Sequence, residues 1–266
     1  MSCRQDEWAN GYKMGEHKVR PYGVRTRWCR ARTLCSPSLR GLPLLSDTYA
    51  HNTTNCRNTM NITTLHHPLA QHFLTHLRDK TTKPSLFRLL TKRLTVLLVL
   101  EATQTLTLRP RSIATPLEQL DSPVLDDPLV AVPILRAGLG MLDPIVEFFP
   151  DVSVGYIGLA RDHKTAVASP YYAKLPPDMN RRTTLILDPM LATGGSASQA
   201  IATVKAAGAG RILMLSLVAA PEGVQLLNAD HPDVPLFTAA LDRELDSRKY
   251  ILPGLGDFGD RLYGTE

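Results

Sequence analysis

A loop at residues 188–196 carries the residue types that bind a phosphorylated sugar. It belongs to the segment TLILDPMLATGGSASQAI, from Thr184 to Ile201. The apolar run before the loop is typical of a strand buried on both faces, and the Ala-rich run after it favours a helix. Gly194 and Gly195 let the backbone approach a ligand closely, and the N–H groups at the start of a helix attract an anion. The segment therefore predicts a phosphate site.

The polar side chains of this loop extend the prediction from a phosphate to a sugar. Thr193 and Ser196 are hydroxyl donors, and Asp188 ends the strand, where open α/β sheets bind ligands. Its carboxylate can accept hydrogen bonds from sugar hydroxyls. The alternative is an ordinary strand–turn–helix connection in which a hydroxyl side chain caps the helix. The segment lacks both the Walker GKS/T and the dinucleotide GxGxxG, which disfavours an ATPase or a dehydrogenase.

A second loop combines an arginine with two glycines. The segment LVAVPILRAGLG, from Leu129 to Gly140, reads as a buried strand followed by a turn. An isolated arginine usually lies in solvent. Arg136, however, ends a buried strand beside Ala137 and Gly138, so we interpret it as an anion ligand. A rigid guanidinium fork is well suited to a diphosphate.

A third segment, near the C-terminus, is rich in glycine. Tyr250 to Thr265 reads YILPGLGDFGDRLYGT, with four glycines and one proline that exclude a long helix or a regular strand. Asp257 and Asp260 lie among the glycines. A purely structural turn is the alternative to a binding loop here.

Together these segments resemble the type I phosphoribosyltransferases, and among them the uracil phosphoribosyltransferases. DPMLATGGS is similar to the loop that binds phosphoribosyl diphosphate (PRPP), PILRAGLG to the pyrophosphate-binding loop, and the C-terminal string to the uracil-binding loop YIVPGLGDxGDRxFGT. Many type I members carry two adjacent acids at the end of the strand, and here the second position is Pro189. Uracil phosphoribosyltransferases share this proline, so the departure narrows the family. The resemblance covers residues 60–266.

The resemblance implies the conversion of uracil and PRPP to uridine monophosphate (UMP) and diphosphate, through an oxocarbenium-like state. It implies catalytic roles for Arg136, Arg161, Asp188 and Asp257. It implies uracil contacts at Ile251, Gly256, Asp257 and Phe258, mainly through the backbone; Phe258 stands where many bacterial members have Ala. Mg²⁺ is expected to arrive bound to PRPP, without a direct protein ligand. The implied PRPP contacts are Arg136, Arg161, Asp188, Pro189, Met190, Leu191, Ala192, Thr193, Gly194, Gly195, Ser196 and Asp257.

Arg161 belongs to a further strand candidate, VSVGYIGLARDHKT, which precedes YYAKLP at Tyr171–Pro176. In the resembling family this region is a flexible hairpin that closes over PRPP, with the matching arginine on the diphosphate. The alternative is a solvent-facing hairpin whose charges have no role. We do not assign His163 as a base, because a loop histidine without a visible partner is usually solvated. The base for the uracil N1 proton stays open.

These loops need a sheet to position them, and the hydropathy pattern predicts one. Helical spacing extends over 69–77 and 85–105, and residues 103–123, with three prolines, read as an extended connection or a strand pair. After these, strands alternate with helices, which predicts an α/β fold with a central, mainly parallel sheet and flanking helices, as in type I phosphoribosyltransferases. The strands are expected near 129–134, 153–159, 184–188, 211–218 and 235–240, and the helices near 138–148, 196–207 and 222–229.

The charge of the chain is divided unevenly. The formal net charge is +5, but residues 1–59 carry +6 and residues 60–266 carry −1. All four cysteines, Cys3, Cys29, Cys35 and Cys56, also lie before Met60, in no zinc or disulfide pattern. The enzyme-like part has no strong cluster of Lys and Arg, so nucleic-acid binding is not predicted. No apolar run in residues 1–59 is long enough for a secretory core or a membrane span, and we expect a cytoplasmic protein without membrane association.

Other functions on the same fold remain open. A pyrimidine-responsive RNA-binding regulator would need a basic face, a silent homologue would be expected to lose Arg136 or the DPMLATGGS loop, and a phosphoribosyltransferase for another base is the nearest enzyme alternative. The family forms dimers and sometimes larger homo-oligomers, with residues 85–105 as one potential interface. GTP activates some members, and no motif in this sequence reports that effector.

Residues 1–59 have three interpretations. They are an organelle-targeting extension, against which Asp6, Glu7 and Glu16 argue; a disordered interaction arm; or sequence upstream of a start at Met60. We favour the last, because MNITTLHHPLAQHFLTHLRDK is similar to the beginning of a short family member. The predicted organisation is therefore a leader at 1–59 and a phosphoribosyltransferase domain at 60–266.

We predict that a chain starting at Met60 forms UMP at the rate of the full chain, because residues 1–59 contribute neither core nor site. Steady-state turnover of uracil and PRPP by both chains measures this. A shortened chain with the circular dichroism of a folded protein but no turnover would contradict the prediction.

Overall fold

The computed structural model describes residues 61–126, 128–161 and 168–265, all within one compact unit, Asn55–Glu266. The predicted leader 1–59 lies outside the described residues. No helix in the described part of the chain is both long and apolar enough to cross a membrane.

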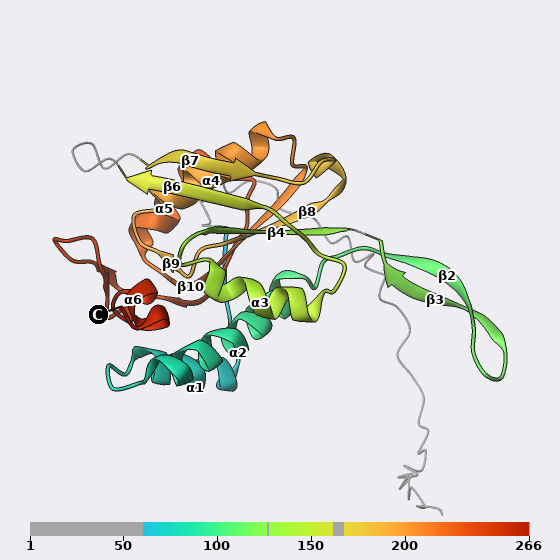
Figure 1. The fold of residues 1–266 in the computed structure, drawn as a ribbon, viewed down its shortest axis with the longest axis horizontal. Helices are drawn as coiled ribbons and strands as arrows, with labels where there is room; N and C mark the ends of the chain where they lie inside the picture. The colour runs from blue at the N-terminus through green and yellow to red at the C-terminus, as the bar shows by residue number, and fades with distance from the viewer. Residues whose placement is uncertain (1–60, 127, 162–167, 266) are drawn as a thin grey trace, which may run out of the picture. The chain divides into compact units, whose positions relative to one another are not determined.

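A nine-stranded sheet runs through this unit (Figure 1). Its strand order is β1-β11-β10-β8-β4-β6-β7, with β5 beside β4 and β9 beside β10. All neighbours are parallel except β6 and β7, so the predicted mainly parallel sheet is confirmed. The strands are β1 (Ile62–Thr64), β4 (Leu129–Leu135), β5 (Ser153–Val154), β6 (Tyr156–Arg161), β7 (Ala168–Lys174), β8 (Thr183–Leu187), β9 (Met190–Leu191), β10 (Arg211–Ala219) and β11 (Leu236–Leu241).

Helices cover both faces of this sheet. One core cluster joins the first three helices to Leu185 and Leu187 of β8, and a second joins α4 and α5 to Ile186 of the same strand. This alternation follows from the two-residue repeat of a strand, which sends successive side chains to opposite faces. The helices are α1 (Pro68–Arg78), α2 (Pro84–Ala102), α3 (Leu139–Phe148), α4 (Gly195–Ala206), α5 (Pro221–Asp230), α6 (Phe258–Tyr263) and the 3₁₀ turn η1 (Met179–Arg181).

The neighbours β4 and β8 mark the point where the chain changes direction across the sheet. The connection after β4 runs through α3 on one face, whereas the connection after β8 runs through α4 on the other face. The two strands are in register, with Val132 opposite Ile186 and Pro133 opposite Leu187. Connections that depart to opposite faces mark a switch point of the sheet, and α/β proteins commonly bind ligands beside such a point, at the carboxyl ends of the strands.

Two small antiparallel pairs lie apart from the main sheet. β2 (Leu108–Ala114) and β3 (Gln119–Leu125) form a strand pair, one of the two alternatives expected for 103–123, and it projects as an arm (Figure 1). All residues of β2 are exposed, which explains why two paired prolines, Pro110 and Pro123, are tolerated in this isolated ribbon. The other pair is β12 (Glu244–Leu245) with β13 (Ile251–Leu252).

Three details differ from the predicted elements. The helix predicted to reach residue 105 ends at Ala102, where the Thr103 hydroxyl donates to the Val99 carbonyl at 2.7 Å. The strand predicted at 153–159 is divided at Gly155, where a side chain would meet Leu175 and the carbonyl of Lys174. The short elements β1, β9 and α6 were not predicted, because each is too short, or too rich in glycine, for a hydropathy repeat. β7 forms the second strand of the hairpin expected after Arg161.

Candidate active site

The loop after β8 is held by β10. The Asp188 N–H donates to the Leu215 carbonyl at 3.1 Å, and the Pro189 carbonyl accepts from the N–H groups of Leu217 and Val218, each at 3.1 Å. The Leu191 N–H donates to the Ser216 hydroxyl at 3.2 Å. Pro189, which follows the carboxylate at the end of the strand, thus joins the loop to the sheet through its carbonyl.

The two glycines of this loop have different structural reasons. Gly194 has a φ of +83°, which favours glycine, and a side chain there would lie 2.8 Å from the Gly223 carbonyl. At Gly195 an added Cβ would find no protein atom closer than 4.0 Å, so the protein itself does not require a glycine there. α4 starts at Gly195 without a side-chain cap. Its first N–H groups are therefore available to an anion.

The loop after β4 packs against the end of β8. A Cβ on Gly138 would lie 2.4 Å from the Leu187 carbonyl, so only glycine permits this approach. Arg136 is exposed beside it, after a cis peptide bond with Leu135. The Tyr263 hydroxyl donates to the Arg136 carbonyl at 3.4 Å, and burial raises the pKa of Tyr263 above its ordinary value. The structure therefore brings Arg136 and Asp188 to neighbouring strand ends.

A hollow of about 280 Å³ connects the first loop with the C-terminal string. All four residues predicted to contact uracil line it, and Met190 and Ala192 of the predicted PRPP loop form another part of its wall. Two sequence segments about 60 residues apart thus share one cavity. The lining residues are Met190, Ala192, Arg248, Lys249, Tyr250, Ile251, Gly256, Asp257 and Phe258.

The aromatic ring of Phe258 belongs mainly to the core. The residue is 3% exposed, and its ring centroid lies 5.4 Å from that of Phe87 on α2. Gly140 of α3 makes room for it, because a Cβ there would meet the Phe258 ring at 3.2 Å. The volume that distinguishes Phe from Ala is therefore taken up by the core, and the predicted recognition of a base by the backbone here does not depend on the ring.

A turn before the C-terminal string supplies residues that the sequence motifs missed. Asp246 accepts from the N–H groups of Arg248 and Tyr250, each at 2.8 Å, and Lys249 adopts a φ of +70°. The Tyr250 N–H holds the pKa of Asp246 below its ordinary value. Arg248 and Lys249 thus reach the rim of the hollow as two cations. The segment DSRKY, in which an aspartate can form an Asx turn, is the local sequence signal from which this turn could have been predicted.

For two of the predicted site residues, Arg161 and Asp257, the structure gives only part of the predicted role. Arg161 ends β6, which pairs with β4, so its backbone continues the strand next to the one before Arg136. Its side chain and residues 162–167, with His163, lie outside the described part of the chain. Asp257 lies in the hollow and caps α6, since its carboxylate accepts from the Asp260 N–H at 3.0 Å. Its contact with PRPP stays a prediction.

Substitutions of the two glycines in the loop are expected to affect different properties, stability at Gly194 and PRPP binding at Gly195. We expect Gly194→Ala to lower the free energy of unfolding by about 1–3 kcal/mol, because alanine is strained at positive φ. Gly195→Ala is expected to keep the unfolding temperature but to weaken PRPP binding about tenfold, since its methyl group enters space that the protein leaves open. Thermal unfolding and PRPP titration of both variants test this. Unchanged PRPP affinity in Gly195→Ala would contradict the prediction that this loop binds the phosphate of PRPP.

Comparison with known proteins agrees with this geometry. The family model for uracil phosphoribosyltransferase matches residues 64–265. Uracil phosphoribosyltransferase of Roseiflexus sp. (strain RS-1) is 52% identical over 199 residues, which are 75% of this chain and 96% of the relative. That of Paracoccus denitrificans (strain Pd 1222) is 48% identical over 206 residues, 77% of this chain and 98% of the relative.

Among solved structures, the AQ2163 protein from Aquifex aeolicus is similar in fold, with a TM-score of 0.74 and 34% identity. The match covers 77% of this chain and 99% of that one. The described fold, the joined loops and the family match over most of the chain lead to one assignment. The chain belongs to the uracil phosphoribosyltransferase family.

Proposed function

We propose that this chain transfers the phosphoribosyl group of PRPP to N1 of uracil, forming UMP and diphosphate. The observation that carries the proposal is the hollow shared by the loop at 190–192 and the C-terminal string at 251–258. A transferase must hold donor and acceptor side by side, and this cavity joins the segment suited to a sugar phosphate with the segment suited to a pyrimidine.

Residues that follow β4 and β8 each bind a different part of PRPP, the donor of the phosphoribosyl group. The loop at Thr193–Ser196 and the start of α4 hold the 5′-phosphate, and Asp188 accepts hydrogen bonds from the ribose hydroxyls. Arg136 pairs with the diphosphate. The bond from C1′ to the diphosphate oxygen breaks and its electron pair leaves with the diphosphate, while the N1 lone pair forms the new bond to C1′ from the opposite face. Catalysis is then mainly positioning and charge stabilisation.

Uracil lies in the hollow against the backbone of Ile251 and of Gly256–Phe258. Backbone N–H and C=O groups can pair with the donors and acceptors on the edge of a pyrimidine. We expect Arg161 to pair with the diphosphate, and the hairpin that follows it to exclude water, which otherwise hydrolyses PRPP. The proton of N1 has no assigned acceptor.

Mg²⁺ is the cofactor of this proposal. Among the described residues no group of three or more His, Cys, Asp or Glu side chains could hold a metal ion, and Asp188 and Asp257 are the carboxylates of the proposed site. Such a donor set fits an ion that comes with the phosphate oxygens of its substrate, as Mg²⁺ commonly does. When bound, Mg²⁺ neutralises charge on the diphosphate.

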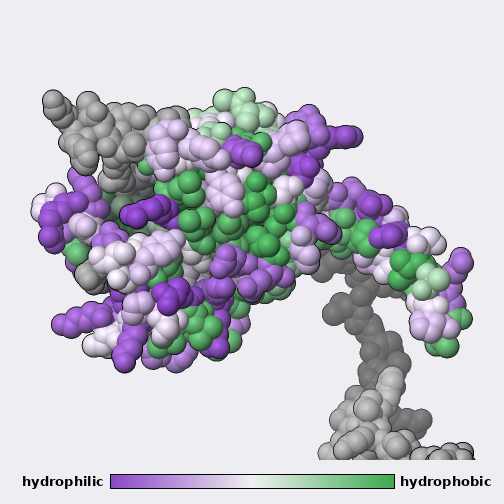
Figure 2. Space-filling model, in the orientation of Figure 1, coloured by the Kyte–Doolittle hydropathy of each residue, from purple (hydrophilic) through white to green (hydrophobic). Residues whose placement is uncertain are grey.

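Exposed apolar side chains support the proposal of a homo-oligomer. Leu86, Leu89 and Leu100 are exposed on α2, and Val146 and Phe148 on α3. Figure 2 shows apolar side chains gathered on the face that carries α3. Contiguous apolar surface of this kind favours association with another protein surface. GTP activation, the cytoplasmic location and the leader at 1–59 stay predictions.

The site map is tested by two substitutions. We expect Arg136→Ala to lower kcat/KM for PRPP roughly 10- to 100-fold, since it removes charge-assisted hydrogen bonds to the leaving group. Asp188→Asn keeps the size of the side chain and is expected to raise the KM for PRPP. UMP formation with saturating uracil and Mg²⁺ measures both. Unchanged turnover and PRPP affinity in both variants would refute the map.

The choice of base is tested by competition. With PRPP and Mg²⁺, uracil is expected to be consumed while adenine, guanine and hypoxanthine are left unchanged, because the backbone of the C-terminal string is suited to a pyrimidine edge. Chromatography of the nucleotide products measures this. Formation of a purine nucleotide at a comparable rate would favour the alternative, a phosphoribosyltransferase for another base.

A further inference from the structure

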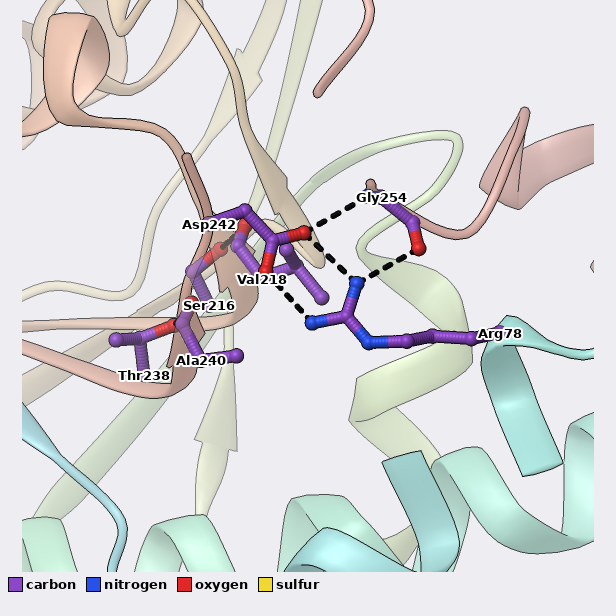
Figure 3. Close-up of polar contacts among 7 residues, drawn as sticks. All are labelled: Arg78, Ser216, Val218, Thr238, Ala240, Asp242 and Gly254. Atoms are coloured by element: carbon purple, nitrogen blue, oxygen red, sulfur yellow. Dashed lines mark hydrogen bonds and ion pairs between the residues drawn. The ribbon is translucent and has the colours of Figure 1, made fainter. Parts of the chain in front are cut away.

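An ion pair outside the motifs holds the middle of the C-terminal string (Figure 3). Arg78, the last residue of α1, donates from Nη1 and Nη2 to the two carboxylate oxygens of Asp242, at 2.8 and 2.6 Å. The same Nη1 donates to the Gly254 carbonyl at 2.7 Å, and the Gly254 N–H donates to Asp242 at 2.8 Å. Both backbone groups of Gly254 are therefore bound by this one pair.

Gly254 is a point at which the string has little freedom. Its φ is +59°, and a Cβ there would lie 2.1 Å from the Ile251 carbonyl. It lies between Ile251 and Gly256, two of the residues proposed to contact uracil. An error in the backbone at Gly254 would therefore displace the groups that read the base on both sides of it.

The carboxylate of this pair is buried and the guanidinium is partly buried. The side chains of Arg78 and Asp242 are 24% and 4% exposed, and the Asp242 N–H donates to the carbonyl of Ala219 at the end of β10. A buried ion pair commonly adds little net stability over apolar side chains of similar volume. Its bidentate geometry does fix the distance and orientation of the segments that it joins. Here it joins α1, the end of β11 and the C-terminal string.

A second arginine makes the reciprocal connection. Arg261 of α6 donates to the carbonyls of Leu77, Leu255 and Asp79, the last two at 2.6 Å, and its guanidinium lies 4.6 Å from the centroid of the Phe87 ring. Arg78 thus reaches from α1 to the string, and Arg261 reaches from the string back to the carbonyls at the end of α1. The string is held at both sides of Gly256.

The PRPP loop has anchors of its own. The Leu191 N–H donates to the Ser216 hydroxyl, and that hydroxyl donates to the Val218 carbonyl at 3.0 Å. Neither hydrogen bond includes Arg78 or Asp242, although Ser216 and Val218 lie in the same corner of the fold (Figure 3). The side-chain contacts that hold the two loops are therefore different, although the backbones of Asp242 and of β9 both join the end of β10.

We propose that Arg78 and Asp242 are positioning residues for base recognition, which act through Gly254 on the backbone that contacts uracil. This inference rests on the proposed function, because it takes the C-terminal string as the uracil site. Since the base is read by backbone groups, its affinity depends on residues that fix the backbone rather than on a side chain in the hollow. Loss of the pair weakens uracil binding and leaves PRPP binding nearly unchanged.

The test compares Arg78→Lys, Asp242→Asn and the double variant Arg78→Met/Asp242→Leu. The lysine keeps the charge but cannot bridge Asp242 and Gly254 in the same way, and the double variant removes both charges without leaving one buried alone. We expect the KM for uracil to rise about tenfold or more in each, as for a lost charge-assisted hydrogen bond. The KM for PRPP is expected to change less than about twofold. Arg243→Gln, in an exposed ion pair beside Asp242, is the matched control and should change neither constant.

A further variant separates this inference from the proposed site. Gly256→Ala alters the string directly, at a φ of +81°. If it leaves the KM for uracil unchanged, the proposed uracil site fails. If it raises that KM while the Arg78 and Asp242 variants do not, only the positioning role is overturned. Equal rises in both KM values, or loss of cooperative thermal unfolding in Arg78→Lys, would assign the pair to folding alone and also overturn it.

Discussion

The departure of two chain connections to opposite faces of one sheet is the constraint on which the site depends. β4 and β8 are in register, and their following helices, α3 and α4, pack in different core clusters. The two loops therefore begin side by side at the carboxyl ends of the strands and then lead to opposite faces of the sheet. The apolar runs of both strands are buried on both faces, and the points at which these runs end determine where the two loops begin. An exposed arginine and a carboxylate follow these runs.

In the proposed site, backbone groups make up much of the surface that would contact the ligands. Gly138 permits contact with the end of β8, Gly194 adopts positive φ, and the first N–H groups of α4 lack a side-chain cap. The C-terminal string likewise presents its backbone, while the ring of Phe258 packs against Phe87. Backbone groups are useful for recognition because they lose little conformational freedom on binding, provided that the surrounding protein already holds them in place.

The sequence allowed prediction of those parts whose physical cause is local. Apolar runs predicted β4, β8 and β10, and glycines next to them predicted the loops, because strand burial and positive φ leave a signature within a few residues. The interaction of Arg78 with Asp242 could not be predicted this way, since 164 residues separate the two and neither belongs to a motif. Arg248 and Lys249 reach the hollow only because an Asx turn at Asp246 directs the backbone there. The short helix α6 was hidden by the glycines around it.

The placement of Phe258 has a consequence for how such a site can change over evolutionary time. Its side chain packs against α2 and α3, whereas the residue also lines the cavity. Selection on the core and selection on ligand choice therefore act on different atoms of one residue. The amino acid at this position is free to vary with the helices behind it while the ligand stays the same.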